Sequence, residues 1–363
     1  MTSMKPLPPI RFYIPRSDCG ASELPDTIAG YWSWISSQAQ VDSWGPFSWT
    51  LQTYLYLKAD GFPCELNHTL PEEGIVVAHR DFLPTHLKPG PNLLVACILA
   101  DREEPGFIGR HPYAQIHIVQ NPRDPMVIRF LTLWPGHYMP YWSQPGLIPR
   151  DSARGDRFEI AAFFGYEHNL APELQGPTWD AAVQELGITW WVAPRERWHD
   201  YSHVDAIVAV RSFANAQAYV YKPPSKLHNA WCAGVPAVLG CESAYQAGRQ
   251  TEFDYIEVRS PDEALSALRR LRDNPDLRRE MRANGKRRAS AIRPESVVKL
   301  WRRLLCDELL TSYERWRSAP RWVRAAFVTL RTKAFYRIMA KRHPDGIWAA
   351  TYPRSPGTDF LIR

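Results

Sequence analysis

Short apolar runs alternate with turns and amphipathic segments along most of the chain. A helix is predicted from Gly45-Pro46 onwards, because Phe47, Leu51 and Leu55 recur on one face after this start. Strand-like runs lie at residues 10–15, 74–79, 92–100 and 114–120. Strands separated by a helix and by longer connections are typical of a parallel sheet with crossovers. The pattern therefore predicts an α/β domain over residues 1–135.

A second α/β pattern begins after a segment rich in proline and aromatic residues. Residues 130–150 hold four prolines at positions that disfavour a helix or a central strand, so residues 136–150 are predicted to form a hinge. Strands are then predicted at 158–165, 188–194, 204–211 and 235–240, and those at 188–194 and 204–211 are expected to be buried. Helices are predicted at 172–186, 225–234, 261–273, 275–290 and 294–310. This alternation indicates a second doubly wound domain over 151–310.

The distribution of charge singles out the C-terminal third. Residues 261–363 hold 24 Lys and Arg against 11 Asp and Glu, a net charge of +13, whereas residues 1–260 hold 20 against 27, a net charge of −7. Residues 311–363 form a basic, aromatic and partly helical tail. A basic third favours a polyanionic partner, and an anionic membrane surface is considered. On a helix over about 322–340, however, the cations do not segregate to one face, which argues against a simple membrane-surface helix.

The chain has no apolar run near the roughly 20 residues that a membrane span needs, and its first residues lack the apolar core of a signal peptide. A cytoplasmic protein is expected, peripheral at the inner membrane face if the tail binds lipid. The six cysteines show no paired spacing, so free thiols are expected.

The stretch KPPSKLHNAWCAGVPAVLG, residues 222–240, places two lysines at the start of a short helix that leads into a buried strand. Ser225 is predicted to be the N-cap, and the free N–H groups and dipole at a helix start favour a phosphate group. Lys222 and Lys226 would add positive charge for a diphosphate. The structural alternative is that the helix packs on the sheet and that both lysines are merely solvated.

Two segments, the first of which extends the same stretch, favour a phosphate-binding role of the lysines over the structural alternative. The run KPPSKLHNAWCAGVPAVLGCES and the later run SPDEALSALRRLRDNPDLRREMRANGKRRA resemble the donor-binding domain of GT-B glycosyltransferases, of the bacterial group 1-like kind. The resemblance covers residues 158–305 well and reaches the first half only through the two-domain plan. It implies two Rossmann-like domains facing a cleft, with part of the C-terminal helical tail crossing back to the first domain.

The resemblance also implies which residues bind the donor, a nucleotide-diphosphate sugar. The predicted donor-binding residues are Gly165, Arg211, Lys222, Ser225, Lys226, Asn229, Glu242 and Ser243. Many retaining members carry a Glu pair where this chain has Tyr221 and Asn229, so the stereochemistry is open. No D-x-D pair occurs in the chain, and a metal-independent reaction without a cofactor is expected.

Two residues of the first domain are candidates for catalysis. Asp18 follows the first predicted strand and could remove the proton of an acceptor hydroxyl, although an ordinary turn would explain it as well. His79 ends the strand at 74–79, where either a catalytic role or a place in the core is open.

The sequence thus predicts a hexosyltransferase-type enzyme that transfers a sugar to a glycan or to a lipid-linked acceptor, as in polysaccharide biosynthesis. Two rivals stay open: a nucleotide-sugar 2-epimerase of the same fold, and a non-catalytic basic adaptor on membranes. Nucleic acid is not expected as a partner, since no reading motif accompanies the charge.

Overall fold

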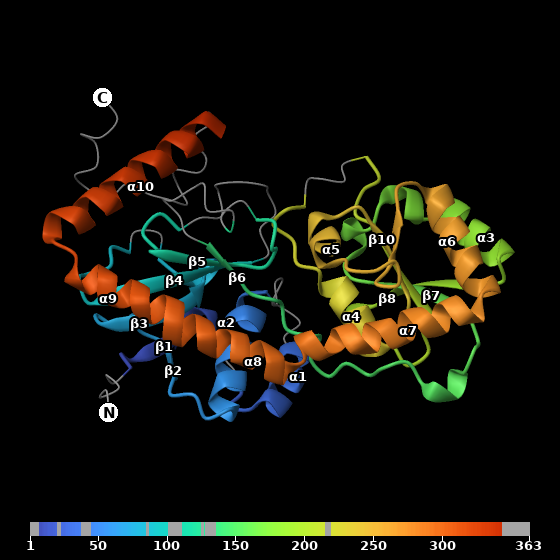
Figure 1. Ribbon diagram of the computed structural model, residues 1–363, viewed down its shortest axis with the longest axis horizontal. Coiled ribbons are helices and arrows are strands. Elements are labelled where there is room, and N and C mark those ends of the chain that lie inside the picture. Colours follow the sequence, from blue (N-terminus) through green and yellow to red (C-terminus); the bar gives the residue numbers. More distant parts are fainter. Residues whose placement is uncertain are drawn as a thin grey trace. The chain divides into compact units, whose positions relative to one another are not determined.

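The chain folds into two compact units, here called unit 1 and unit 2 (Figure 1). The computed structural model describes residues 7–19, 23–37, 45–84, 87–100, 111–124, 127, 136–214 and 219–342. Unit 1 comprises Met1–Met139 and Val298–Arg363, and unit 2 comprises Pro140–Val297. The predicted hinge therefore contains the boundary, and residues 343–363 of the predicted tail lie outside the described residues.

Unit 1 contains a six-stranded sheet in the order β2-β1-β3-β4-β5-β6, in which every pair of neighbours is parallel. Its strands are β1 (Ile10–Tyr13), β2 (Glu65–Asn67), β3 (Gly74–His79), β4 (Leu93–Leu99), β5 (Ile116–Val119) and β6 (Gly136–Tyr138). β3, β4 and β5 are buried along their whole length, which explains their continuous apolar sequences. The strand order reverses between β1 and β3.

Helices α1 (Ile28–Ser37) and α2 (Gly45–Ala59) connect β1 to β2. The predicted face of α2 is confirmed, since Phe47, Leu51 and Leu55 are buried in the core of unit 1. The hinge predicted at 136–150 starts too early, because β6 already pairs with β5 at the edge of the sheet. Prolines close to an edge strand are tolerated, which is why their presence misled the prediction.

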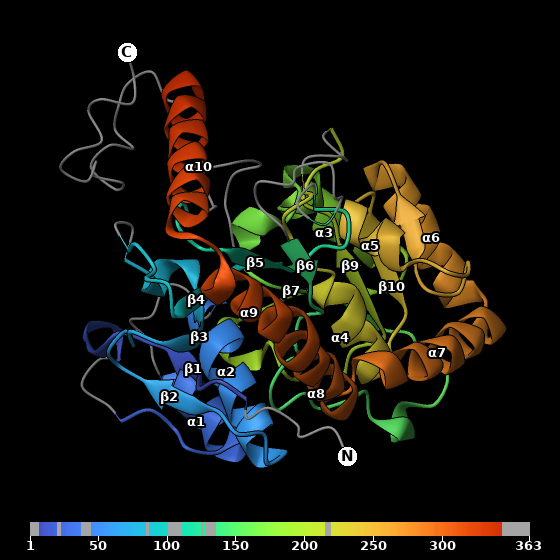
Figure 2. The ribbon, with the colours of Figure 1, turned by 60° about the vertical axis from the view of Figure 1, so that its left-hand side comes forward.

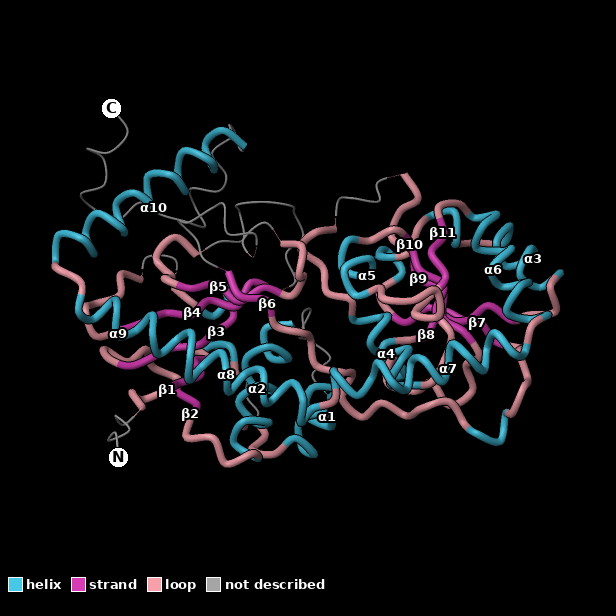
Figure 3. Tube along the Cα trace, viewed as in Figure 1, coloured by secondary structure: helices cyan, strands magenta, loops and turns pink. Residues whose placement is uncertain are grey.

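Unit 2 contains a five-stranded parallel sheet in the order β11-β10-β9-β7-β8 (Figure 3). The strands are β7 (Ile160–Phe164), β8 (Thr189–Ala193), β9 (Ala206–Ala209), β10 (Ala237–Gly240) and β11 (Ile256–Val258). The chain moves outwards from β7 to β8 and then returns to β9 on the other side of β7. Because crossovers are right-handed, this reversal places helices on both faces of the sheet.

The helices of unit 2 follow the predicted pattern except for α5, which was not predicted, and α3, which starts five residues later than predicted. α3 (Pro177–Glu185), α4 (Ser225–Ala233), α5 (Ser243–Gly248), α6 (Pro261–Asp273) and α7 (Pro275–Ala289) are interleaved with or follow the strands. α6 starts at an N-cap, Ser260, whose hydroxyl accepts a hydrogen bond from the Glu263 amide at 3.1 Å. The predicted doubly wound α/β architecture is therefore confirmed for both units.

One strand of unit 2 departs from the prediction. Residues 188–194 were expected to be fully buried, but most of β8 is partly exposed. β8 is the edge strand of its sheet and has β7 as its neighbour on one side only. Aromatic residues such as Trp190 and Trp191 made the run look like a central strand, although large rings also suit a half-buried edge. All six cysteines are free thiols, as predicted.

A long helical segment carries the chain from unit 2 to the end of the described residues. It consists of α8 (Pro294–Arg303), a π-helical stretch (Leu304–Leu309), α9 (Leu310–Ser318) and α10 (Arg321–Arg342). The boundary predicted at 310 lies near 297 instead, because Trp301 of α8 is fully buried and contacts the ring of Phe12 in β1. None of the described helices combines the length and the apolar character that a membrane crossing requires.

Candidate functional site

The carboxyl ends of β7, β9 and β10 bring several predicted residues together in unit 2. Ligands of open α/β sheets bind outside these ends, where the strand order reverses. Here the reversal falls between β7 and β9, which are followed by Gly165 and by Val210-Arg211. Glu242 follows β10, the next strand. The topology therefore predicts a ligand site among these three loops.

Arg211 and Glu242 form a buried ion pair at this edge. The guanidinium of Arg211 donates from Nη1 to Oε2 of Glu242, and both side chains are largely shielded from solvent. Burial raises the pKa of Glu242, while the charges of Arg211 and Lys226 oppose this rise. Oε1 of Glu242 and Nε of Arg211 have no hydrogen-bond partner among the described residues. Glu242 therefore holds Arg211 in place beside the switch point.

Lys226 reaches the same place from α4. A Cβ atom built on Gly165 would lie 2.9 Å from Nζ of Lys226 and 3.1 Å from the Phe163 ring, so the ammonium group lies against the backbone that follows β7. The same Nζ lies 5.1 Å from the centroid of the Phe163 ring. A glycine at position 165 permits this approach. The predicted residues Gly165, Arg211, Lys226 and Glu242 thus form one cluster, which we call the switch-point cluster.

The electrostatics of the cluster favour the binding of an anion. Desolvation, and then the charge of Arg211, lower the pKa of Lys226 to about 7, although Glu242 raises it. An ammonium group that is destabilised in this way gains from any anion that binds beside it. Lys222 adds a further positive charge, which contributes to the lowered pKa of Lys226.

The start of α4 differs in detail from the prediction. The helix begins at Ser225, but its N-cap is Pro224, and no side chain caps the first turn by a hydrogen bond. Ser225 is thus the first helical residue, and its predicted role as the N-cap is wrong. Proline at the cap cannot accept an amide proton through its side chain, so the first N–H groups of α4 are left for another acceptor. Gly234 ends the helix in the left-handed conformation, at φ 68°.

Three aromatic residues complete the cluster and were not predicted. Tyr219 lies 5.5 Å from the guanidinium of Arg211, measured to its ring centroid. Tyr245 of α5 is fully buried beside Arg211, and its hydroxyl group has no hydrogen-bond partner among the described residues. Phe163 of β7 lies beneath Lys226. The sequence around these three residues contains no pattern that indicates their proximity to Arg211.

Asn229 and Ser243 lie near the cluster in sequence but differ in setting. The side-chain oxygen of Asn229 accepts a hydrogen bond from the Gln144 amide at 3.0 Å, and its side chain also bonds the hydroxyl of Tyr201. Asn229 therefore joins α4 to the segment after the unit boundary, and its contact with the donor stays a prediction. Ser243 is the first residue of α5 and is buried.

The two predicted catalytic residues lie at the reversal point of the sheet of unit 1. Asp18 is exposed in a short turn after β1 and accepts a hydrogen bond from the Ser17 hydroxyl at 3.0 Å. His79 ends β3 and is fully buried. Its Nε2 lies 3.2 Å from the Ala100 carbonyl, and its Nδ1 accepts from the Asp81 amide at 3.3 Å. Both ring nitrogens of His79 thus have partners inside the core, which is one of the two alternatives that the sequence left open, and its catalytic role stays a prediction.

Within the described ranges, no three or more His, Cys, Asp and Glu side chains gather as they would around a metal ion. Asp205, whose spacing from two histidines resembles a ligand set, instead accepts hydrogen bonds from Arg150 and Arg154.

Substituting Gly165 by alanine tests the close approach of Lys226. The new methyl group would displace the ammonium group, and φ 157° at this position adds backbone strain of about 1–3 kcal/mol. We expect weaker binding of nucleoside diphosphates, measured by titration calorimetry. Gly187→Ala is the matched control, because it has φ 69° with no atom within 4 Å of the added Cβ. Equal affinities in the two variants would contradict the assigned position of Lys226.

Comparisons with known proteins support the resemblance predicted from the sequence. Residues 161–292, which make up most of unit 2, match a family model described as glycosyl transferase-like. The match covers β7 to the end of α7, which includes the whole switch-point cluster. No curated protein matches the chain in sequence.

Solved structures are similar to this chain at low sequence identity and with TM-scores below 0.5. A pneumococcal O-GlcNAc transferase, GtfA, solved with UDP and GlcNAc, is 12% identical with a TM-score of 0.46, covering 72% of this chain and 60% of its own. HepE of Anabaena, solved with UDP, is 11% identical with a TM-score of 0.48, and the match covers 84% of this chain and 100% of the HepE chain. Sucrose-phosphate synthase of Thermosynechococcus elongatus is 13% identical with a TM-score of 0.44, and the match covers 73% of this chain and 78% of the synthase chain. This chain thus spans less than two thirds of the GtfA chain, and scores of this size say nothing about substrate.

Proposed function

We propose that the protein is a glycosyltransferase that takes a sugar from a nucleotide-diphosphate sugar and transfers it to a hydroxyl group of a glycan or lipid-linked acceptor. The observation that carries this proposal is the switch-point cluster. It combines a buried arginine, a lysine pressed against a glycine backbone and the uncapped start of α4. Diphosphates bind to such combinations of cations and free N–H groups. The glycosyltransferase-like family match of the same residues supports this reading.

In the proposed reaction, the bond between the anomeric carbon and the diphosphate oxygen breaks, and its electron pair stays on the diphosphate. A new bond forms between the anomeric carbon and the acceptor oxygen, whose proton passes to a base or to the departing phosphate. Negative charge therefore builds up on the diphosphate in the transition state. Lys226, Arg211 and Lys222 would stabilise this charge, and the first N–H groups of α4, from Ser225 onwards, would add to the effect.

Two acidic groups have different roles in this proposal. Glu242 acts as a positioning residue, because its buried carboxylate fixes the guanidinium of Arg211. Asp18 is an exposed carboxylate at the reversal point of the sheet of unit 1, and a carboxylate there can accept the proton of an acceptor hydroxyl. Asp18→Asn tests that role: loss of transfer with unchanged donor affinity supports it, and full activity rejects it. Two further parts of the proposal are separate from this test. Ser243 is proposed to contact the donor sugar, and the reaction is proposed to need no metal ion.

Donor binding is expected to depend on pH through Lys226. Its pKa of about 7 in the free protein would rise beside a bound diphosphate, so binding takes up a proton above pH 7. The affinity should be flat below pH 7 and should fall by up to about tenfold per pH unit above it, until the pKa of the bound state is reached. Calorimetry in buffers of different ionisation enthalpy measures this proton uptake. Lys226→Arg keeps the charge and should abolish the dependence; an unchanged dependence in that variant would contradict the assignment to Lys226.

A thermal-shift panel of nucleoside diphosphates and their sugars, followed by product analysis, tests the proposed function itself. We expect stabilisation by at least one nucleotide, slow hydrolysis of its sugar without acceptor, and transfer when acceptor is added. Formation of an epimer from the donor alone would identify a nucleotide-sugar 2-epimerase. A flat panel, with association that depends strongly on salt, would identify a non-catalytic adaptor.

A further inference from the structure

The outer surface of α10 has an unusual composition for an exposed helix. The 22 residues of α10 include seven lysines and arginines and no acidic residue. The helix lies beyond β4 and β5 in unit 1 (Figure 2). Phe335 and Tyr336 anchor it in the core of that unit, and Arg331 is buried beside them, 4.8 Å from the centroid of the Phe327 ring. One side of the helix is therefore fixed to the unit, and the opposite side is open.

The open side of α10 is a continuous stripe at helical spacing. Successive members are three or four residues apart, which places them on one face of the helix. In chain order the stripe consists of Trp322, Ala326, Leu330, Lys333, Arg337 and Lys341. The first three are exposed apolar residues, and the last three are cations that are exposed or partly exposed. The stripe is thus apolar in its first half and cationic in its second half.

The cations off the stripe explain why the sequence argued against such a surface: Arg331 is buried, Arg324 donates to the Ala319 carbonyl, and Arg321 is the first residue of the helix. When every cation of the helix is counted, the positive charges surround it. Of the remaining cations, Lys333, Arg337 and Lys341 lie on one face, opposite the side that is buried against unit 1.

The apolar half of the stripe is exposed to an extent seen nowhere else in the described residues. Trp322 is 73% exposed and Leu330 is 55% exposed, the two highest values among large apolar side chains of the described part. Tryptophan prefers the interface between lipid headgroups and acyl chains. Exposed apolar residues that continue into a row of cations are typical of helices that lie on anionic membranes.

We propose that this stripe binds the surface of an anionic lipid bilayer. Trp322 and Leu330 enter the headgroup region, and Lys333, Arg337 and Lys341 pair with the lipid phosphates. An acidic protein surface would meet the cations but would leave Trp322 and Leu330 without an apolar partner, so a bilayer fits both halves better. The inference does not rest on the proposed transferase activity; if both hold, the acceptor is presented at the membrane surface.

Co-sedimentation of the full chain with lipid vesicles tests this proposal. We expect binding to vesicles of phosphatidylcholine and phosphatidylglycerol, and much weaker binding to phosphatidylcholine alone. Each cation near an anionic surface contributes about a fivefold change in partitioning, so replacing Lys333, Arg337 and Lys341 by glutamine should lower it by about a hundredfold. Replacing Trp322 and Leu330 by alanine should lower it by at least about tenfold.

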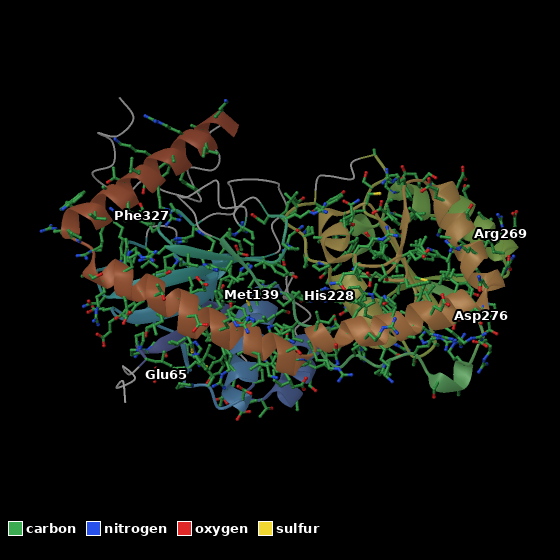
Figure 4. The ribbon with its side chains drawn as sticks, in the orientation of Figure 1. Glu65, Met139, His228, Arg269, Asp276 and Phe327 are labelled. Carbon is green, nitrogen blue, oxygen red and sulfur yellow. The ribbon has the colours of Figure 1, made fainter. Side chains whose placement is uncertain are left out.

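The matched control removes the same charge from unit 2. Arg269, Arg270 and Lys286 are exposed on α6 and α7, and Arg269 projects from the outer side of α6 (Figure 4). Their replacement by glutamine should leave vesicle binding unchanged. All variants must keep the wild-type circular dichroism spectrum and the wild-type thermal shift with nucleoside diphosphate, which reports unit 2 and so separates this test from that of the proposed function.

Three results would overturn the proposal. The first is equal sedimentation of the wild type with neutral and anionic vesicles, or no sedimentation with either. The second is an equal loss of binding in the control triple variant, which would indicate a response to net charge alone. The third is undiminished binding after Trp322 and Leu330 are replaced, which would favour a soluble polyanion over a bilayer.

Discussion

Replacing Lys226 by methionine is expected to lower kcat/KM for sugar transfer by about a hundredfold to a thousandfold. The ammonium group lies against the backbone of Gly165 and beside the Arg211–Glu242 pair, where few groups can replace it. Its charge acts most strongly on the departing diphosphate, so the loss should appear in kcat as well as in KM. Steady-state kinetics with the donor identified by the thermal-shift panel measure the effect.

Two variants make this result specific to charge at Nζ. Lys226→Arg keeps the charge and should retain a large part of the activity. Lys222→Met removes a charge whose Nζ lies 5.5 Å from the ring centroid of Tyr221 and not against the backbone of Gly165, and it should cost less. A Lys226→Met enzyme with wild-type kcat/KM, or a greater loss in Lys222→Met, would contradict the assigned role.

The largest expected effect on stability comes from Asp205, at the opposite end of β9. Its carboxylate is buried and accepts hydrogen bonds from the side chains of Arg150 and Arg154 and from the amides of Glu159 and Ile160. Asp205→Ala would leave two largely buried guanidinium groups without their partner. We expect unit 2 to lose about 3–5 kcal/mol of stability.

Hydrogen exchange of the peptides that contain β7 measures this change locally, which avoids treating a chain of two units as a two-state system. Asp273→Ala is the control, because the ion pair of Asp273 with Arg272 is exposed and should contribute at most about 1 kcal/mol. Equal exchange rates in the two variants would contradict the expected cost.

Because of the same carboxylate, we expect unit 2 to lose stability at low pH. Burial would raise the pKa of Asp205, but hydrogen bonds from Arg154, from the Glu159 and Ile160 amides and from Arg150 hold it below its usual value. A lowered pKa in the folded state means that the contribution is complete above the usual aspartate pKa of about 3.9 and is lost as the pH falls through the lower folded value. Asp205→Ala should remove this part of the acid dependence.

The elements predicted best are those with a continuous apolar run or with a clear local signal at their start. β3 was predicted with its observed bounds because five apolar or small residues follow one another in a central strand before His79. α6 was predicted with its observed bounds because Ser260, Pro261 and Glu263 mark its start. Short edge strands such as β2 and β11 were missed, since three residues contain too little pattern for any period to be seen.

The candidate site was predictable only as a set of strand ends. Topology brings Gly165, Arg211 and Glu242 to one edge, and the sequence identified that edge through the order of its strands and helices. Sequence could not reveal that Asn229 bonds Gln144, because the two residues are 85 positions apart. It could not reveal the burial of His79 either, since a histidine at the end of a strand suits both the core and a cleft.

A crystal structure of the protein with the nucleoside diphosphate that stabilises it would show directly whether the switch-point cluster binds the donor. We expect the diphosphate to lie within hydrogen-bonding distance of Nζ of Lys226 and of the first N–H groups of α4, with Arg211 beside it. A nucleotide bound elsewhere, with Lys226 still against Gly165 and making no contact to phosphate, would contradict the proposed donor site.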